Sequence, residues 1–369
     1  MRLLFVYGFA PSGHASAAKA LEARARALGH ETSCLDISAD YHRILGPAIN
    51  NIYLTLIQSF PNLWTTIHDN ESAAEVLSQW RKIYHLFEGQ RLRETVDELK
   101  PDLIVCTHAG PFSALAVAKE KGQVTAGLAA VLTDFHPHPY WAVPGADVYV
   151  TADEAAARVM ERRGIPKERL VPAGIPVHPL FEAPADRSQE RRALGLPEDS
   201  PAVLVTGGSR GLGKMAEAVE AALAALPRAS VLAVCGSNEA LLERLRQTQA
   251  AVPRLRAFGA LPPEGIRRLM AAADLMIGKA GGLTSAECLC LGLPLVVLDP
   301  IPGQEQNNAQ HLADAGAAVV ADGPAALPEM LPALLEPARL RSLREAALRL
   351  ARPGAGARAL DAILVLKTL

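Results

Sequence analysis

ADLMIGKAGGLTSAE, residues 273–287, combines a short apolar run, a loop with three glycines and the start of a helix. A buried strand that passes through a glycine loop into a helix is the building unit of a parallel sheet covered by helices. Gly281 and Gly282 stand where the helix begins. The first amides of the helix therefore stay free, and with the helix dipole they attract a diphosphate. The segment predicts an α/β fold with a phosphate site built into it.

Short apolar runs alternate with helical segments on both sides of this stretch. The first run is followed by a loop over 8–13 and a helix over 15–28. Such alternation predicts parallel sheets that are covered on both faces. The runs predicted to be strands are Leu3–Tyr7, Leu103–Cys106, Ala126–Leu132, Asp147–Val150, Ala202–Thr206, Val231–Cys235, Leu275–Ile277, Leu295–Leu298 and Ala317–Val320.

The length of 369 residues exceeds what one hydrophobic core usually holds and suits two domains. The alternation pauses at the charged, proline-containing segment 181–200, which we interpret as an interdomain linker. The sequence thus predicts two Rossmann-like, doubly wound domains, 1–180 and 201–369, that face a cleft. An alternative position for the last helix is against the N-terminal domain.

Charge, cysteines and hydropathy exclude several classes of protein. The formal net charge is −2, so nothing indicates a nucleic-acid partner. The five cysteines are scattered and odd in number, which favours reduced thiols. No uncharged apolar run reaches the roughly twenty residues of a spanning helix, and the opening MRLLFVYGFA suits a strand better than a signal peptide. We expect a cytoplasmic protein without a cofactor.

A second glycine loop, TGGSRGLG over 206–213, lies between a predicted strand and a helix. Glycines let the backbone approach a phosphate closely, so Gly208, Ser209 and Arg210 are candidate donor-binding residues. The spacing is not that of the dinucleotide fingerprint, and a plain strand–helix turn is the alternative.

Glu287 lies about one turn into the helix that begins near Gly281 and Gly282. A carboxylate at this place can accept hydrogen bonds from the two vicinal hydroxyls of a ribose. The alternative is a glutamate that caps the first turn. Further donor contacts are predicted at Lys279, Leu283 and Thr284.

The segment DPIPGQEQNN, residues 299–308, directly follows a predicted strand. Its prolines and glycine fix a loop at the carboxyl end of the sheet, where α/β proteins bind ligands. A row of amides and carboxylates suits sugar hydroxyls, and a solvated polar loop is the alternative. The candidates for contact with a hexose are Gln304, Glu305, Gln306 and Asn308, of which Glu305 or Gln304 is favoured.

Together these blocks resemble the C-terminal domain of the family 28-type GT-B glycosyltransferases, which include the peptidoglycan lipid II N-acetylglucosaminyltransferase. The run from 258 to 305 is more closely similar to monogalactosyldiacylglycerol synthases and processive diacylglycerol glucosyltransferases. The resemblance covers nearly the whole chain. Its N-terminal motifs are GHASAA at 13–18, NIY at 51–53, PNLW at 61–64, TH at 107–108, TDF at 133–135, HPYW at 138–141 and GIPV at 174–177. Departures in the first loop (Pro11-Ser12-Gly13-His14) and the second (Ser209-Arg210) leave open which sugar is used.

The resemblance implies roles for residues in both halves. His14 would be the general base that deprotonates the acceptor, a task that suits an imidazole whose pKa is near neutrality. Asp134, after another predicted strand, is the competitor: it either orients His14 or acts as the base. The base of the nucleotide would lie against the backbone near Phe258, Gly259 and Ala260.

Other histidines are assigned to the acceptor side. His108 follows a predicted strand, with a structural hydrogen bond as the alternative role. The resemblance implies an acceptor-side loop for His136. His136 and His138 would otherwise suit a metal, although no third ligand is evident. No D-x-D motif occurs in the sequence, so we expect helix dipoles, Ser209 and Arg210 to neutralise the leaving phosphate without a metal.

The segment 46–68 is apolar and aromatic with almost no charge, and the basic pair Arg81-Lys82 follows it. An interfacial helix with an aromatic anchor would dock on an anionic membrane surface. A core helix with a buried Trp64 is the alternative. The candidate acceptor and membrane contacts here are Tyr53, Leu63 and Trp64.

We therefore expect an inverting, metal-independent glycosyltransferase that moves a hexose from a UDP-sugar to a lipid acceptor such as diacylglycerol. It would work as a peripheral protein on the inner face of the cell membrane. The alternatives are another lipid-linked or soluble acceptor, a nucleotide-sugar 2-epimerase, which shares the architecture, and a non-catalytic sugar-nucleotide-binding subunit. The presence of His14 disfavours the last of these, and an epimerase would need further carboxylates. The oligomeric state is not indicated.

Overall fold

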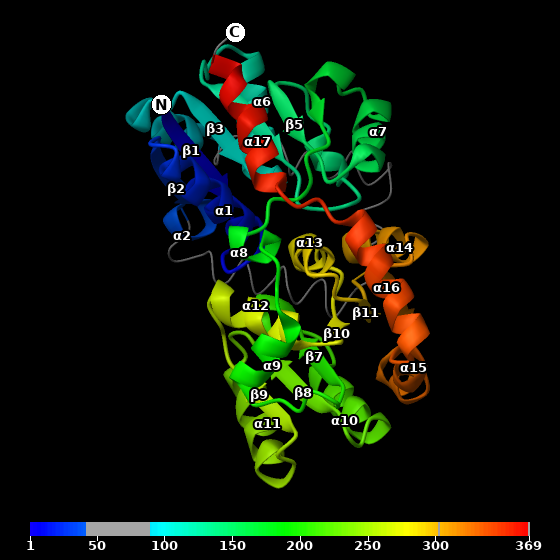
Figure 1. The fold of residues 1–369 in the computed structure, drawn as a ribbon. Coiled ribbons are helices and arrows are strands. Elements are labelled where there is room, and N and C mark those ends of the chain that lie inside the picture. The colour runs from blue at the N-terminus through cyan, green and yellow to red at the C-terminus, as the bar shows by residue number, and fades with distance from the viewer. Residues whose placement is uncertain (42–88, 302, 368–369) are drawn as a thin grey trace. The chain divides into compact units, whose positions relative to one another are not determined.

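The computed structural model describes residues 1–41, 89–301 and 303–367, and these form two compact units (Figure 1). Each unit is built on a parallel six-stranded sheet with helices on both faces. The chain leaves the first unit and returns to it twice. The first unit comprises Met1–Val177, Ile301–Asn307 and Gly354–Leu369, and the second comprises His178–Pro300 and Asn308–Pro353.

The first sheet has the strand order β2-β1-β3-β4-β5-β6. The chain runs outward from β1 to β2 and then resumes on the other side of β1, so the strand order reverses between β1 and β3. Ligands of doubly wound sheets bind at such a switch point, beyond the carboxyl ends of the strands. The strands are β1 (Arg2–Tyr7), β2 (Glu31–Asp36), β3 (Leu103–Cys106), β4 (Gly127–Val131), β5 (Val148–Val150) and β6 (Leu170–Val171). The helices are α1 (Gly13–Ala27), α2 (Ile37–Tyr41), α6 (Ala109–Glu120), α7 (Glu154–Arg162) and α17 (Ala355–Leu364).

Helices cover both faces of this sheet, which explains why its central strands are apolar at nearly every position. On one face, Leu21 of α1 packs in one cluster with Leu360 and Ile363 of α17. Figure 1 shows α17, in red, among the blue and green elements of the first unit. On the other face, Phe112 of α6 packs against Trp141, with ring centroids 5.3 Å apart.

The second sheet has the order β12-β11-β10-β7-β8-β9, and its strand order reverses between β7 and β10. Its switch point therefore lies between the loops that follow these two strands. The strands are β7 (Ala202–Thr206), β8 (Ser230–Val234), β9 (Leu255–Phe258), β10 (Leu275–Gly278), β11 (Leu295–Leu298) and β12 (Ala318–Ala321). The helices are α8 (Pro179–Glu182), α9 (Arg187–Leu194), α10 (Met215–Ala225), α11 (Glu239–Ala251), α12 (Pro263–Ala272), α13 (Gly282–Cys290), α14 (Gln304–Asp314), α15 (Leu327–Leu334) and α16 (Pro337–Leu350), of which α14 begins in the first unit.

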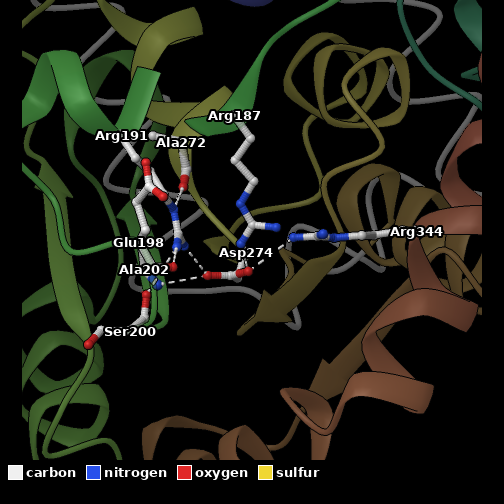
Figure 2. Close-up of polar contacts among 8 residues, drawn as sticks. All are labelled: Arg187, Arg191, Glu198, Ser200, Ala202, Ala272, Asp274 and Arg344. Carbon is white, nitrogen blue, oxygen red and sulfur yellow. Dashed lines mark hydrogen bonds and ion pairs between the residues drawn. The ribbon is translucent and has the colours of Figure 1, made fainter. Parts of the chain in front are cut away.

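The segment 181–200, interpreted above as a linker, holds the end of α8 and all of α9 and belongs to the second unit. Arg191 of α9 is buried, and its Nε donates to Ala272 O at 3.0 Å. The same guanidinium binds Asp274, whose Oδ2 also accepts from the Ala202 amide at 2.9 Å (Figure 2). The charges that suggested an exposed linker are therefore used to attach α9 to the amino ends of β7 and β10.

Asp274 also binds arginines from two further places. Arg187 of α9 forms an ion pair with it, and Arg344 of α16 lies 3.1 Å from its Oδ1. Burial, together with the neighbouring charges of Arg344 and Arg191, lowers the pKa of Arg187 to about 9. One carboxylate thus joins α9 and α16 to the amino end of β10 (Figure 2).

None of the helices in the described ranges is both long and apolar enough to cross a membrane. The predicted membrane segment 46–68, with Tyr53, Leu63 and Trp64, lies outside the described residues. Its predicted contacts stay predictions.

Candidate functional site

His14 lies at the switch point of the first sheet. It is the second residue of α1, whose N-terminus is capped by the Ser12 hydroxyl, and it follows the loop after β1. Thr107 follows β3 directly, and Thr133 comes just after β4. Because the carboxyl ends of parallel strands share one edge of the sheet, these three residues meet there.

Two hydrogen bonds at His14 settle its tautomer. Nδ1 lies 2.8 Å from the carbonyl oxygen of Thr107 and 2.8 Å from Oγ1 of Thr133. A carbonyl can only accept, so the proton of the neutral ring sits on Nδ1. Nε2 therefore keeps its lone pair and is the ring atom that can take up a proton. In return, the Thr107 hydroxyl donates to the backbone carbonyl of His14 at 2.8 Å.

The surroundings keep His14 neutral. Burial lowers the pKa of His14 below its usual value, and this effect is opposed by the charge of Asp134 and the hydrogen bond to Thr107. An imidazole that is neutral at physiological pH is ready to accept a proton.

Asp134 is placed differently from His14. Its side chain is buried, with 3% exposed, and it accepts a hydrogen bond from the Gln304 amide within the first unit. His14 keeps part of its surface exposed. Of the two base candidates, the geometry gives His14 the available lone pair, whereas Asp134 contributes a nearby negative charge.

His108 presents the opposite tautomer. It caps α6, where its Nδ1 accepts from the Gly110 amide at 3.2 Å, so the neutral ring carries its proton on Nε2. Its ring stands edge-on to that of His14, with centroids 4.9 Å apart. Burial, aided by the charges of His14 and His138, lowers the pKa of His108 to about 3. His108 is thus a neutral hydrogen-bond donor beside His14. His136, which follows β4, is half-buried.

In the second unit, the loop after β7 is fixed by close backbone packing. A Cβ at Gly211 would lie 2.0 Å from Cys235 O, and one at Gly236 would lie 2.3 Å from Ser209 O. Only glycine fits at either position. The Ser209 carbonyl also accepts from the Ser237 amide at 3.0 Å. The loop is therefore rigid, with Ser209 exposed and Arg210 half-buried.

The loop after β10 leads into the open N-terminus of α13. Among the described residues, no side chain caps this helix at Gly281, and a Cβ at Gly281 would meet open space. The loop is held from behind by Asn308, a fully buried residue whose amide donates to Ala280 O at 3.1 Å. Asn308 thus positions the predicted diphosphate loop. Uncapped amides at a helix start are suited to an anion.

Glu287 has a half-buried carboxylate on α13. Burial raises its pKa to about 8. No hydrogen bond or ion pair joins this carboxylate to another described side chain or amide, so it does not act as the capping glutamate that was the alternative. A desolvated carboxylate without a partner is suited to the hydroxyls of a ligand.

The remaining predicted donor residues are divided between the two units, since Glu305 and Gln306 belong to the first unit. Phe258 ends the edge strand β9, and its carbonyl accepts from the Cys235 amide at 2.8 Å. Glu305 accepts from the Ile301 amide at 3.0 Å, which closes the start of α14, while Gln306 is exposed. Gly259 is half-buried and Ala260 exposed, Gly208, Lys279 and Thr284 are half-buried, and Gly282 and Leu283 are buried.

Four contributors were missed by sequence reasoning. Thr107 and Thr133 fix His14, while Lys214 and Asp299 form an ion pair of 3.1 Å beside the second switch point. In each contact the two partners are distant in sequence and follow different strands, so no local pattern signals the contact.

Two family models match the chain. Residues 14–177 match the monogalactosyldiacylglycerol (MGDG) synthase model, and residues 202–361 match the glycosyltransferase family 28 C-terminal domain. Among curated relatives, the processive diacylglycerol beta-glucosyltransferase of Bacillus cytotoxicus is 29% identical over 358 residues, covering 96% of this chain and 90% of the relative. That of Bacillus mycoides is 29% identical over 361 residues with the same coverage.

Solved structures show the same fold. MurG of Acinetobacter baumannii superposes with a TM-score of 0.64 at 18% identity over 99% of both chains. The UDP-GlcNAc 2-epimerase of Neisseria meningitidis gives a TM-score of 0.65 at 14% identity over 100% of both. This fold serves a transferase and an epimerase alike, so the family assignment rests on the two matched domains. Because these domains together span most of the chain, it belongs to the family 28-type GT-B glycosyltransferases, with an N-terminal domain of the monogalactosyldiacylglycerol synthase type.

Proposed function

We propose that this glycosyltransferase moves a hexose from a UDP-sugar to a hydroxyl of diacylglycerol or a related lipid, with inversion and without a metal. The names of the curated relatives support the lipid acceptor and a glucosyl group. The observation that carries the proposal is the locked tautomer of His14, which leaves Nε2 as a proton acceptor at the switch point of the first sheet.

In the proposed reaction, the acceptor hydroxyl gives its proton to Nε2 of His14 while its oxygen attacks the anomeric carbon. The bond from that carbon to the β-phosphate oxygen breaks, and its electron pair leaves with UDP. A single displacement of this kind inverts the anomeric centre. Asp134 favours the imidazolium that forms, because an opposite charge nearby stabilises the protonated ring.

The donor half of the reaction is assigned to the second unit. The uncapped amides of α13 would receive the diphosphate, with Ser209 and Arg210 of the rigid loop after β7 adding donors. Glu287 would accept the ribose hydroxyls. Fixed dipoles and cations aimed at the leaving phosphate replace the role that a metal has in other transferases.

The lipid half is assigned to the first unit. We propose that the segment 46–68 contacts the acyl chains of the acceptor and the anionic surface of the membrane, from the cytoplasmic side. Its apolar and aromatic composition supports this role. Substituting Leu63 and Trp64 by alanine should reduce sedimentation with anionic vesicles while UDP binding persists.

The test is a transfer assay with UDP-glucose and UDP-galactose on vesicles that contain diacylglycerol, with and without EDTA. We expect a β-linked glycolipid product in both conditions. Loss of transfer with EDTA would contradict metal independence. Conversion of a UDP-N-acetylhexosamine to its 2-epimer without transfer would support the epimerase alternative, and UDP binding with neither activity would indicate a binding subunit.

A further inference from the structure

An ion pair crosses the carboxyl edge of the second sheet beside the open N-terminus of α13. The Nζ of Lys214, which precedes α10, lies 3.1 Å from Oδ2 of Asp299. Thr206, Gly278 and Val297 form one row across β7, β10 and β11. The two charged residues follow the outer two of these strands, which are about 10 Å apart. The pair therefore spans the end of β10.

This pair is poorly suited to a structural role. The Lys214 side chain is 57% exposed, and an ion pair with so exposed a partner contributes little to stability. Oδ2 of Asp299 is buried but accepts no hydrogen bond from the described part of the chain, so the contact is an ion pair without hydrogen-bond alignment. Asp299 also has a φ of 44°, a left-handed conformation that is unfavourable for most residues.

Further positive charge surrounds the pair. Lys279 follows β10 directly, and a Cβ at Gly213, next to Lys214, would lie 3.7 Å from Lys279 Cε. Arg210 belongs to the same loop as Gly213. The loops after β7 and β10 thus contribute three cationic side chains at the edge where α13 presents uncapped amides.

We propose that Lys214 binds the diphosphate of the donor and that Asp299 holds it in place while the site is empty. The proposal rests on the proposed function, because it takes the ligand at this edge to be a UDP-sugar. A diphosphate carries more negative charge than one carboxylate, so the Lys214 ammonium gains by exchanging partners. Opening the existing pair costs little on the lysine side, because the Lys214 side chain is more than half exposed.

The first measurement compares UDP with uridine, which lacks phosphate, by calorimetry on the full chain. Lys214→Gln should lower the affinity for UDP about tenfold and leave that for uridine unchanged. Asp299→Asn should raise the affinity for UDP about two- to fivefold, since it frees Lys214. Asparagine tolerates the left-handed conformation, so the backbone is preserved.

The second measurement combines the two substitutions. It is needed because removing the negative charge of Asp299 near a diphosphate would raise UDP affinity by reducing electrostatic repulsion, even if Lys214 had no role. If Lys214 is the group released, Asp299→Asn has no effect on UDP affinity in the Lys214→Gln background. An equal gain in both backgrounds would overturn the exchange. The matched control is Arg244→Gln, which breaks a similarly exposed ion pair with Glu220 at 2.9 Å and should change neither affinity.

The outcomes also separate this inference from the proposed function. A parent protein that binds UDP, combined with a Lys214→Gln variant whose UDP-to-uridine affinity ratio is unchanged, overturns the role of Lys214 alone. A parent protein that binds no UDP overturns the donor site and the role of Lys214 together.

Discussion

At the switch point of the first sheet, His14 and Thr133 hydrogen-bond each other, and only the lone pair of Nε2 remains for a substrate. At the switch point of the second sheet, no described side chain caps the amides of α13, and none hydrogen-bonds to the carboxylate of Glu287. The polar groups at the edge of the first sheet have their hydrogen-bond partners before a substrate arrives. Those at the edge of the second sheet lack partners until a ligand binds. Changes in the first unit should therefore alter the rate, and changes in the second should alter affinity.

The largest effect is expected from His14→Ala. Loss of a general base typically lowers turnover by about a hundred- to ten-thousandfold. UDP affinity should stay nearly unchanged, because Glu287 and the loops proposed to bind the diphosphate belong to the other unit. Transfer kinetics and UDP calorimetry on the folded variant test this. Turnover within a few-fold of the parent would move the role of base to Asp134.

The role of the charge cluster around Asp274 is tested by the substitution Asp274→Asn. Removing one partner of a buried charge cluster typically costs about 3–5 kcal/mol of stability, and here it leaves Arg187, Arg191 and Arg344 without their carboxylate. Thermal and urea unfolding measure the loss. The control is Glu198→Gln, which breaks an exposed pair with Arg192 and should cost at most about 1 kcal/mol. Equal losses in both variants would show that the cluster has no special role.

A third prediction concerns the ribose site. Glu287→Ala should lower UDP affinity about ten- to a hundredfold, the value of a charge-assisted hydrogen bond. Ribose hydroxyls donate to the ionised carboxylate, so UDP affinity of the parent should fall as the pH drops below about 8. Calorimetry from pH 6 to 9 tests this against Glu287→Gln, which should lack this part of the pH dependence. Parallel pH profiles would contradict the assignment.

The same glutamate should destabilise the empty protein. Its folded-state pKa is raised from 4.5 to about 8, so the folded state holds the proton more tightly than the unfolded chain. Stability therefore falls as the pH rises from about 4.5 to 8. Glu287→Gln should raise the Tm at pH 8 and leave it unchanged near pH 4.5. A lower Tm for Glu287→Gln at pH 8 would refute the raised pKa.

The smallest effect is expected from Thr133→Val. The hydroxyl accepts from Nδ1 of His14 and so favours the protonated ring, and without it the base is weaker and less well oriented. We expect kcat to fall about three- to tenfold and the acidic limb of the pH profile to move to lower pH. Thr133→Ser should restore both. A reduced kcat with an unmoved pH profile would indicate packing alone.

The sequence predicted the central strands and failed mainly at the sheet edges. Central strands such as Leu103–Cys106 are apolar throughout, because helices cover both faces. The missed strands β2, β6 and β9 are edge strands with partly exposed residues, so their sequences lack a continuous apolar run. The edge strand β12 was found because it is rich in alanine and valine.

The predicted site residues follow the same logic. Glycine loops before helices are local patterns, so the loops at Gly208 and Gly281 were evident from the sequence. The bonds that give His14 its tautomer join residues 93 and 119 positions apart, and no local pattern encodes them. The sequence did not reveal that α9 is attached to the second sheet for the same reason, since Arg191 and Asp274 are separated by 83 residues.

The return of the chain to the first unit has a consequence for synthesis on the ribosome. Leu360 and Ile363 of α17 complete the core cluster that Leu21 begins, and Arg358 donates to Ala173 O, 185 residues earlier. Translation proceeds from the N-terminus, so the first unit waits with an uncovered apolar face while the whole second unit emerges. We therefore expect the nascent first unit to be a client for chaperones until α17 leaves the exit tunnel, whereas the second unit is complete once Pro353 has been added.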